Sequence, residues 1–279
     1  MALKHTLKAA AVAALAVGCT ASAWAGSIIR MESRDHAAGA VTVGNVNLSV
    51  DGESLRMDME GMEEGDQGSM VFKSDLNEMM AIDHARKEFY IIDEATMQGM
   101  ANQMGSAMQQ MQAALADLPP EQRAMAEQMM QQRFGAMGAG APEEPQTSVS
   151  RTGGSDTVNG FDCEVFEVSQ DGRRISELCV ADWGDIEGGS DVADSMQNMA
   201  RFFENLRDMF AQAGAGFMDM SGDMFAHMQE MDGFPVRTRS YDDTGSLENE
   251  TVILSSEEST LDAAVFAAPE GYRQQTMGN

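Results

Sequence analysis

Residues 78–111 read EMMAIDHARKEFYIIDEATMQGMANQMGSAMQQM, and the period of the hydrophobic pattern changes within this stretch. Up to Asp93, two apolar runs separated by a polar turn predict short antiparallel strands. Beyond Asp93, five methionines recur at intervals of three, four, four and three residues, which places them on one face of a helix. These are Met97, Met100, Met104, Met108 and Met111. The stretch predicts a helix inserted into a sheet protein.

Strand patterns continue on both sides of this insertion. Val41–Val50 alternates, with a change of phase at Gly44-Asn45 that predicts a bulge or a turn. Asp51-Gly52 then predicts a hairpin. After the insertion, further strand-like runs separated by polar turns occur at 161–168, 174–181, 234–241 and 246–254. Short strands at such spacing are typical of an antiparallel sheet.

A second helical insertion is predicted over roughly residues 190–231. Its first half carries apolar side chains at helical spacing, namely Val192, Met196, Met199, Phe203, Leu206 and Phe210. The first insertion is expected to extend over about 94–135, with a second helix starting at Pro119-Pro120-Glu121. We therefore predict one α+β domain over 26–279, in which two methionine-rich insertions cover a sheet.

The first 25 residues have the pattern of a signal peptide. Lys4 and Lys8 precede an apolar run over 9–17, and Ala23-Trp24-Ala25 provides the small residues of a cleavage site before Gly26. The run is too short to span a membrane, which takes about 20 residues. These features predict a periplasmic or secreted protein. One alternative stays open, an outer-membrane lipoprotein acylated at Cys19.

The chain is strongly acidic. Cleavage before Gly26 removes Lys4 and Lys8 but no carboxylate, so the formal charge changes from −27 to −29. A chain of this charge repels nucleic acids and anionic membrane surfaces. We expect no nucleic-acid partner, and ligands or envelope partners that are neutral, apolar or cationic. No later segment is apolar enough for a membrane span, so an integral membrane protein is not predicted.

Two cysteines remain after cleavage, Cys163 and Cys179. An even number in an oxidising compartment predicts a disulfide rather than thiolate metal ligands. A three-residue turn over 170–172 would make Ser169 face Arg173. Counting outward from that pair places the two cysteines directly opposite each other, within reach of a disulfide.

Catalytic motifs are not found in the sequence. It has no Gly-X-Ser-X-Gly, no His-Glu-X-X-His, no P-loop and no dinucleotide-binding glycine pattern. The histidines of the mature chain, His36, His84 and His227, are far apart in sequence. We therefore predict a protein that is not an enzyme, with no catalytic residues, no cofactor and no metal site formed by such residues.

Methionine is the outlying residue type, with 26 in the chain. Three interpretations stay open. The side chains can fill irregular gaps between helices and sheet. They can form an adaptable surface for an apolar ligand or partner. They can also hold Cu(I), which selects soft thioether ligands.

Several short motifs support a family resemblance. They are Met79–Asp83, Tyr90–Asp93, Leu118–Arg123, Gly160–Cys163, Glu177–Trp183, Phe234–Arg237 and Pro269–Tyr272. Together they resemble a bacterial family of exported proteins of unknown function that is similar to the lipoprotein carriers LolA and LolB. The resemblance implies a curved antiparallel half-barrel whose concave face is covered by helices and can hold acyl chains. The known carriers lack insertions as long and as methionine-rich as these.

The combined interpretation is a periplasmic binding protein. Its LolA-like half-barrel would hold an apolar or acyl-bearing ligand or partner, with the five methionines of the first insertion facing it. Two alternatives remain: a Cu(I)-buffering protein, and an interaction or structural protein of the envelope that binds no ligand.

Overall fold

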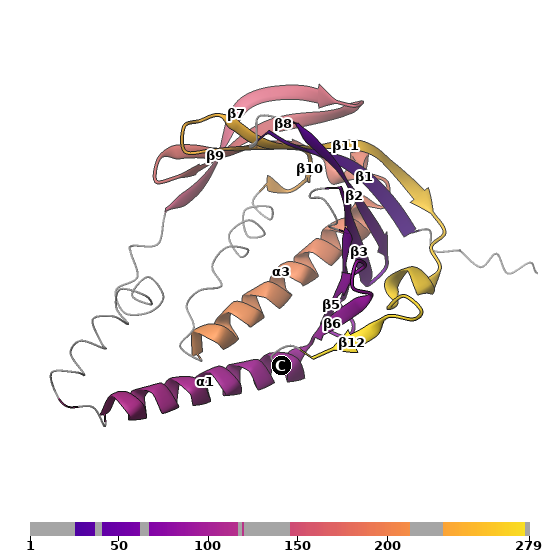
Figure 1. Ribbon diagram of the computed structural model, residues 1–279. Helices are drawn as coiled ribbons and strands as arrows, with labels where there is room; N and C mark the ends of the chain where they lie inside the picture. Colours follow the sequence, from indigo (N-terminus) through magenta and orange to yellow (C-terminus); the bar gives the residue numbers. More distant parts are fainter. Residues whose placement is uncertain are drawn as a thin grey trace, which may run out of the picture.

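The computed structural model (Figure 1) describes residues 26–36, 41–61, 67–116, 119, 146–212 and 231–276. The predicted signal peptide and Cys19 lie outside the described residues. So do His227 and most of the second half of each predicted insertion.

In the described part of the chain, six strands precede the first helix. They are β1 (Gly26–Asp35), β2 (Thr42–Asp51), β3 (Ser54–Glu60), β4 (Gln67–Lys73), β5 (Glu78–Asp83) and β6 (Glu88–Ile92). Each pairs with the next in antiparallel register, as the meander pattern predicts. The bulge or turn predicted at Gly44-Asn45 is wrong, because β2 pairs with both neighbours without a register shift. Gly44 takes a buried position of the alternation, and Val41 and Val43 are exposed.

Six further strands complete the sheet. They are β7 (Thr147–Val158), β8 (Phe161–Gln170), β9 (Arg173–Ala181), β10 (Phe234–Tyr241), β11 (Leu247–Ser259) and β12 (Arg273–Gln275). The strand order is β12-β6-β5-β4-β3-β2-β1-β11-β10-β9-β8-β7. All described pairs are antiparallel except β12 with β6. The sheet is open and strongly curved (Figure 1), so the predicted curved antiparallel sheet is confirmed.

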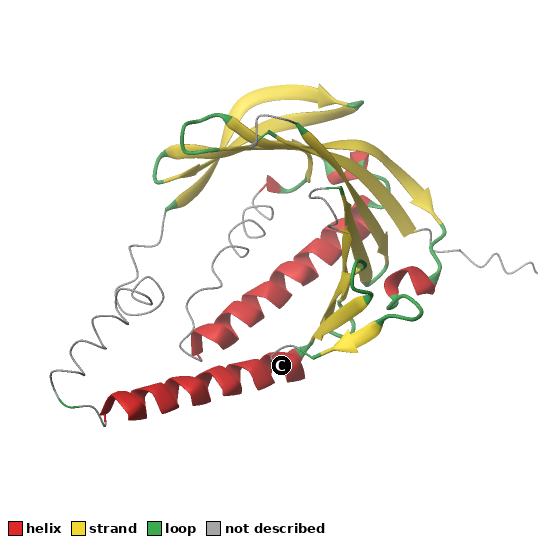
Figure 2. Ribbon diagram, in the orientation of Figure 1, coloured by secondary structure: helices red, strands yellow, loops and turns green. Residues whose placement is uncertain are grey.

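Among the described residues, two long helices lie on the concave side of the sheet (Figure 2). They are α1 (Glu94–Ala116), which follows β6, and α3 (Gly189–Gln212), which follows the short helix η1 (Trp183–Asp185). Both begin where the sequence predicts an insertion. A second short helix, η2 (Ala263–Phe266), lies between β11 and β12.

The start of α3 is fixed by a close backbone approach. A Cβ atom at Gly189 would overlap the carbonyl oxygen of Trp183. Val192, one turn further on, is fully buried and belongs to a core cluster with Ile29 and Leu48 of the sheet. Only glycine fits at position 189, and the helix therefore starts in direct contact with the concave face.

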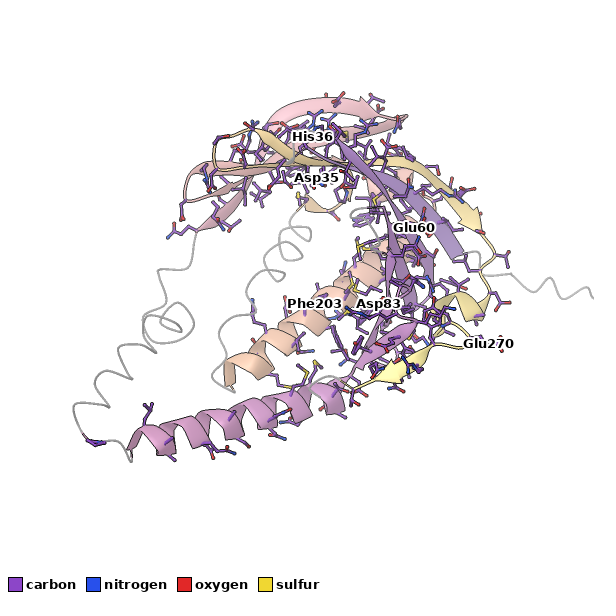
Figure 3. All side chains as sticks on the ribbon, viewed as in Figure 1. Asp35, His36, Glu60, Asp83, Phe203 and Glu270 are labelled. Atoms are coloured by element: carbon purple, nitrogen blue, oxygen red, sulfur yellow. A yellow bond between two sulfur atoms is a disulfide. The ribbon has the colours of Figure 1, made fainter. Side chains whose placement is uncertain are left out.

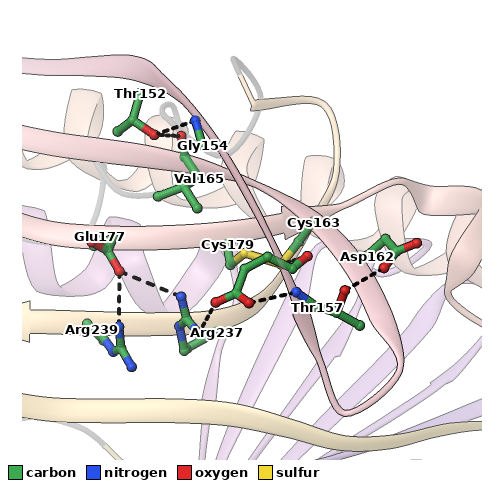
Figure 4. Close-up of a disulfide and its surroundings, with 11 residues drawn as sticks. Thr152, Gly154, Thr157, Asp162, Cys163, Val165, Glu177, Cys179, Arg237 and Arg239 are labelled. Carbon is green, nitrogen blue, oxygen red and sulfur yellow. Dashed lines mark hydrogen bonds and ion pairs between the residues drawn. A yellow bond between two sulfur atoms is a disulfide. The ribbon is translucent and has the colours of Figure 1, made fainter.

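The disulfide between Cys163 and Cys179 is present, with a Cα–Cα distance of 5.3 Å (Figure 4). The predicted register is wrong, because the turn contains two residues, Asp171-Gly172, and Gln170 faces Arg173. Both turn residues have positive φ, +51° and +79°, which suits the right-handed twist of a two-residue hairpin. A bulge between Val168 and Ser169 shifts the register further. Cys179 consequently faces Val165, and the disulfide joins diagonal rather than opposed positions.

Candidate functional site: the concave face

Methionines from four elements meet between the helices and the sheet. Buried Met79 of β5, Met97 of α1 and Met199 of α3 cluster with Phe72 of β4 and Phe202 of α3. Met70, Met100 and Met209 pack around them and are half-buried. We call these six methionines the methionine junction. The same cluster contains the aromatic pair Phe72 and Phe202, whose ring centroids are 5.6 Å apart.

The five methionines predicted to contact a ligand have different surroundings. Met97 is 2% exposed and packs against side chains of the sheet and α3. Met100 is half-buried beside the same cluster. Met104, Met108 and Met111 belong to α1, but their side chains lie outside the described ones. Contact between these residues and a ligand stays a prediction.

Sequence reasoning missed part of the junction. Met79 and Met80 are adjacent, and Met79 faces the helices whereas Met80 lies in a separate cluster on the convex side. Both faces of β5 are apolar, so alternation gave no signal for choosing between them. On α3 the predicted inward residue is Phe203, but Phe202 is the fully buried one. Phe203 is half-buried at the side of the helix (Figure 3). The sequence does not distinguish the two residues, because Phe202 and Phe203 lie three and four positions after Met199 and both fit helical spacing.

A group of polar side chains lies on the concave face of the central strands. It comprises Ser33 of β1, Thr238 and Ser240 of β10, and Asn249 and Thr251 of β11, and we call it the inner polar patch. Ser33 is 1% exposed and the other four are half-buried. The patch interrupts a face that is otherwise largely apolar.

Beyond this patch the concave face is apolar again. Phe166 and Val168 of β8 and Leu178 and Val180 of β9 form a buried cluster with Met231. In the described part of the chain, the principal contacts of α3 with the sheet are with β2 and β3. The concave wall therefore has two apolar regions with a polar region between them.

The convex face of the same strands carries a row of paired charges. Arg239 binds Glu250 (Nε–Oε1 2.8 Å) and Glu177 (Nη1–Oε1 3.3 Å). Arg237 binds Asp156 (Nη1–Oδ2 2.8 Å) and approaches Glu177 (Nη2–Oε1 3.7 Å) beside the disulfide (Figure 4). Burial alone would lower the pKa of Arg239, but Glu250 and then Glu177 hold that pKa above its usual value. The convex face of the central strands therefore carries ion pairs where the concave face carries neutral side chains.

A hydrogen-bonded chain fixes the C-terminal tail to the convex side. The hydroxyl of Ser69 bonds to the carboxylate of Asp58 and lies 2.6 Å from Nε2 of His84. Nδ1 of His84 is 2.9 Å from the hydroxyl of Tyr272. In a Ser-His-Asp triad the carboxylate contacts the histidine, whereas here it contacts the serine, which is 4% exposed. These hydrogen bonds therefore connect the tail to β3, β4 and the turn after β5.

The carboxyl of Asp58 has a pKa below its usual value. Burial alone would raise this pKa, but hydrogen bonds from Arg56 and Ser69 and the charge of Arg56 outweigh burial. Arg56 also donates to the carbonyl oxygen of Val265 in η2 (2.8 Å). The ionised carboxylate thus helps to hold the tail against the sheet.

Replacement of Asp58 should therefore destabilise the fold in a pH-dependent way. The folded pKa lies below the unfolded value of about 3.9, so ionised Asp58 stabilises the fold above that pH. The stabilisation is lost as the pH falls through the folded pKa. Asp58→Asn should lower the free energy of unfolding at pH 7 by about 1.5–3 kcal/mol, with a smaller difference below about pH 3. Urea unfolding measures both values.

Asp75→Asn, in the exposed turn after β4, is the matched control and should change stability little. A destabilisation by Asp58→Asn that stayed constant from neutral to acid pH would contradict the role of the ionised carboxylate.

Residues 93–272 match the family described as Domain of unknown function (DUF4412), which is more than half of the chain. The chain belongs to the DUF4412 family. Predicted membership in a family of unknown function is therefore confirmed. In this DUF4412 protein the match starts at Asp93, so β1–β6 precede it although they belong to the same sheet.

Solved structures that resemble this DUF4412 protein do so at low sequence identity. An uncharacterized conserved protein from Thermus thermophilus has 8% identity and a TM-score of 0.43, with 90% of each chain covered. In the Pseudomonas aeruginosa MucA/MucB complex, one chain matches with 8% identity and a TM-score of 0.35, over 88% of this chain and 56% of that one. A Vibrio parahaemolyticus domain described as a putative outer membrane lipoprotein-sorting protein domain has 10% identity and a TM-score of 0.28, over 88% and 90%. No curated protein matches the chain.

Within the described residues, neither long helix combines the length and hydropathy that a membrane span requires. The same residues contain no group of three or more His, Cys, Asp and Glu side chains arranged to hold a metal ion.

Proposed function

We propose that this DUF4412 protein is a binding protein of the cell envelope that holds an apolar or acyl-bearing ligand between its helices and its concave sheet. The observation that carries the proposal is the methionine junction. Six unbranched, flexible side chains from β4, β5, α1 and α3 meet there. Methionine surfaces repack around apolar groups of different shape.

The distribution of charge supports the same location for the ligand. The convex strands carry paired Arg and Glu side chains such as Arg239 with Glu250, which have no affinity for hydrocarbon. Three apolar clusters lie on the concave side, whereas the apolar cluster of Met80 on the convex side is covered by side chains of the C-terminal tail. Burial of hydrocarbon is favourable by roughly 25 cal/mol per Å², so an acyl chain is expected on the concave side.

The ligand is expected to enter beside α1 rather than through the centre of the sheet. Met97 is fully packed, whereas Met100, one turn further along α1, is half-buried at the margin of the junction. Met104, Met108 and Met111 continue the same helical face. A ligand that parts α1 from α3 would meet these methionines in order.

The test compares two charge insertions on one helix. Met100→Lys places a cation at the margin of the junction, and Gln103→Lys places the same cation on the exposed face of α1. Purified protein should release lipid on organic extraction and bind the apolar dye 1-N-phenylnaphthylamine. We expect Met100→Lys to weaken dye binding at least about tenfold, because the ammonium would be desolvated, and Gln103→Lys to leave it unchanged. Absence of lipid and of dye binding in the unmodified protein would refute the proposal.

A second candidate function is Cu(I) binding at the same junction. The specific observation is that six methionine side chains belong to one cluster, and thioether sulfur is a ligand that Cu(I) prefers. Titration with Cu(I) against a competing chelator separates the two functions. Failure to compete at micromolar affinity would remove the metal function and leave ligand binding untouched.

A further inference from the structure

We propose that the inner polar patch binds the uncharged, hydroxyl-bearing head group of an amphiphile whose apolar part lies on the neighbouring apolar side chains. This head-group site rests on the proposed function and narrows the class of ligand that the protein would hold. It assigns the head group to β10 and β11, away from the methionine junction, and it excludes free fatty acids as the preferred ligand.

Strand register places the patch on the concave face. Ile29 and Met31 belong to the apolar cluster that also contains Val192 of α3. Ser33 is the next residue of β1 on that face, because alternate residues of a strand share a face. Ser33 pairs with Thr251, and Thr251 pairs with Thr238. Paired residues point to the same side of an antiparallel sheet, so these hydroxyls line the concave wall.

The neighbouring row of side chains is also polar. Asn249 of β11 pairs with Ser240 on one side and with Asp35 on the other. Figure 3 labels Asp35, near the end of β1. Two adjacent rows of polar side chains therefore cross three neighbouring strands on a face whose other positions are mostly apolar. The face of an antiparallel sheet that packs on the core is normally apolar, so the position of these two polar rows on that face needs an explanation.

Part of the patch is satisfied internally. Ser33 and Asn249 are hydrogen-bonded at 3.3 Å, and Thr251 donates to Ser33 at 3.2 Å. These bonds hold the three side chains in fixed positions. In the described part of the chain, no side-chain hydrogen bond involves the hydroxyls of Thr238 and Ser240, which are half-buried. These two hydroxyls are available to a ligand beside a preorganised polar group.

The surroundings define the chemistry of the head group. Leu178 pairs directly with Thr238 and belongs with Phe166 to an apolar cluster. Along β11, Ile253 is the next residue on the same face as Thr251, and it is fully buried. Asp35 adjoins the patch and the chain carries a formal charge of −27, so a carboxylate or phosphate head would be repelled. Hydroxyl groups both donate to and accept from Ser, Thr and Asn, and an uncharged glycerol or sugar head fits best.

The test uses two lipids with the same chain and different heads. Monooleoylglycerol has two free hydroxyls, and oleate has a carboxylate. Each lipid displaces 1-N-phenylnaphthylamine from the full-length protein, from the double variant Thr238→Val/Ser240→Ala, and from the control Ser150→Ala. Ser150 is exposed on β7 and pairs with Glu167. Both substitutions in the double variant preserve the shape of the strand, and circular dichroism checks its folding.

We expect monooleoylglycerol to displace the dye from the unmodified protein and from Ser150→Ala at about tenfold lower concentration than oleate. A factor of about ten corresponds to the net contribution of one or two hydrogen bonds. The double variant should lose this preference and bind oleate as before. Equal affinity for the two lipids, or a preference that persists in the double variant, would overturn the head-group site while ligand binding remains. If neither lipid nor dye binds to the unmodified protein, the proposed function itself fails, and the head-group site fails with it.

Discussion

Phe202→Ala should lower the free energy of unfolding by about 3–5 kcal/mol, the usual range for removing a buried phenylalanine. The Phe202 side chain is 0% exposed and lies between the sheet and α1. Its ring centroid is 5.6 Å from that of Phe72 on β4 and 5.7 Å from that of Phe203. Alanine would leave a cavity in the methionine junction and remove both aromatic contacts. Urea unfolding followed by circular dichroism measures the change.

Phe203→Ala is the matched control, because it removes the same group from the next residue of the same helix. Phe203 is half-buried, so the loss should be smaller, at about 1–2 kcal/mol. Equal losses for the two variants would show that the junction does not distinguish the two positions. The junction would then be less closely packed around Phe202 than the structure indicates.

Removal of the disulfide should produce the second large effect. Cys163 and Cys179 have a sequence separation of 16. A disulfide that closes a loop of this size lowers the entropy of the unfolded chain, which stabilises the folded state by about 3 kcal/mol. The double variant Cys163→Ala/Cys179→Ala should therefore lose about 3 kcal/mol. The comparison is urea unfolding of the oxidised protein and the double variant.

Reduction provides an independent control for the disulfide. Dithiothreitol should destabilise the unmodified protein by a similar amount and leave the double variant unchanged. The β8–β9 hairpin also bonds to β7 and β10, so the sheet should remain folded without the disulfide. If reduction left the stability of the unmodified protein unchanged, the disulfide would not constrain the unfolded chain.

Much of the sheet could be predicted from local sequence. The hairpin at Asp51-Gly52 and the meander over β4–β6 follow from turn residues and apolar alternation. Two predictions at glycines are wrong for different reasons. Gly44 takes an inward position of β2, and a glycine fits such a position as well as a turn or a bulge until the neighbouring strands are known. At Asp171-Gly172 the turn lies where the sequence predicts it, but turn residues alone do not distinguish a two-residue loop from a three-residue loop with glycine in its last position.

The candidate site was less accessible to sequence reasoning. The methionine stripe of α1 indicated a helix face, and Met97 and Met100 do lie toward the junction. Their partners Phe72 and Met79 come from strands that are apolar on both faces, so no periodicity marks them. The inner polar patch was not predicted, because its members come from β1, β10 and β11, which only pairing brings together. Threonine is also common in strands generally, so Thr238 and Thr251 carry no signal of a site.

The pairing of β1 with β11 joins residues from opposite ends of the described chain. Pairs so distant in sequence make folding slow, since the entropy of closing a long loop is lost before the contacts form. Until residues 247–259 are synthesised, β1 and β10 each lack a neighbour that the folded sheet provides. The two halves of the sheet, β1–β6 and β7–β10, therefore stay unconnected by strand pairing until nearly the whole described chain has been synthesised.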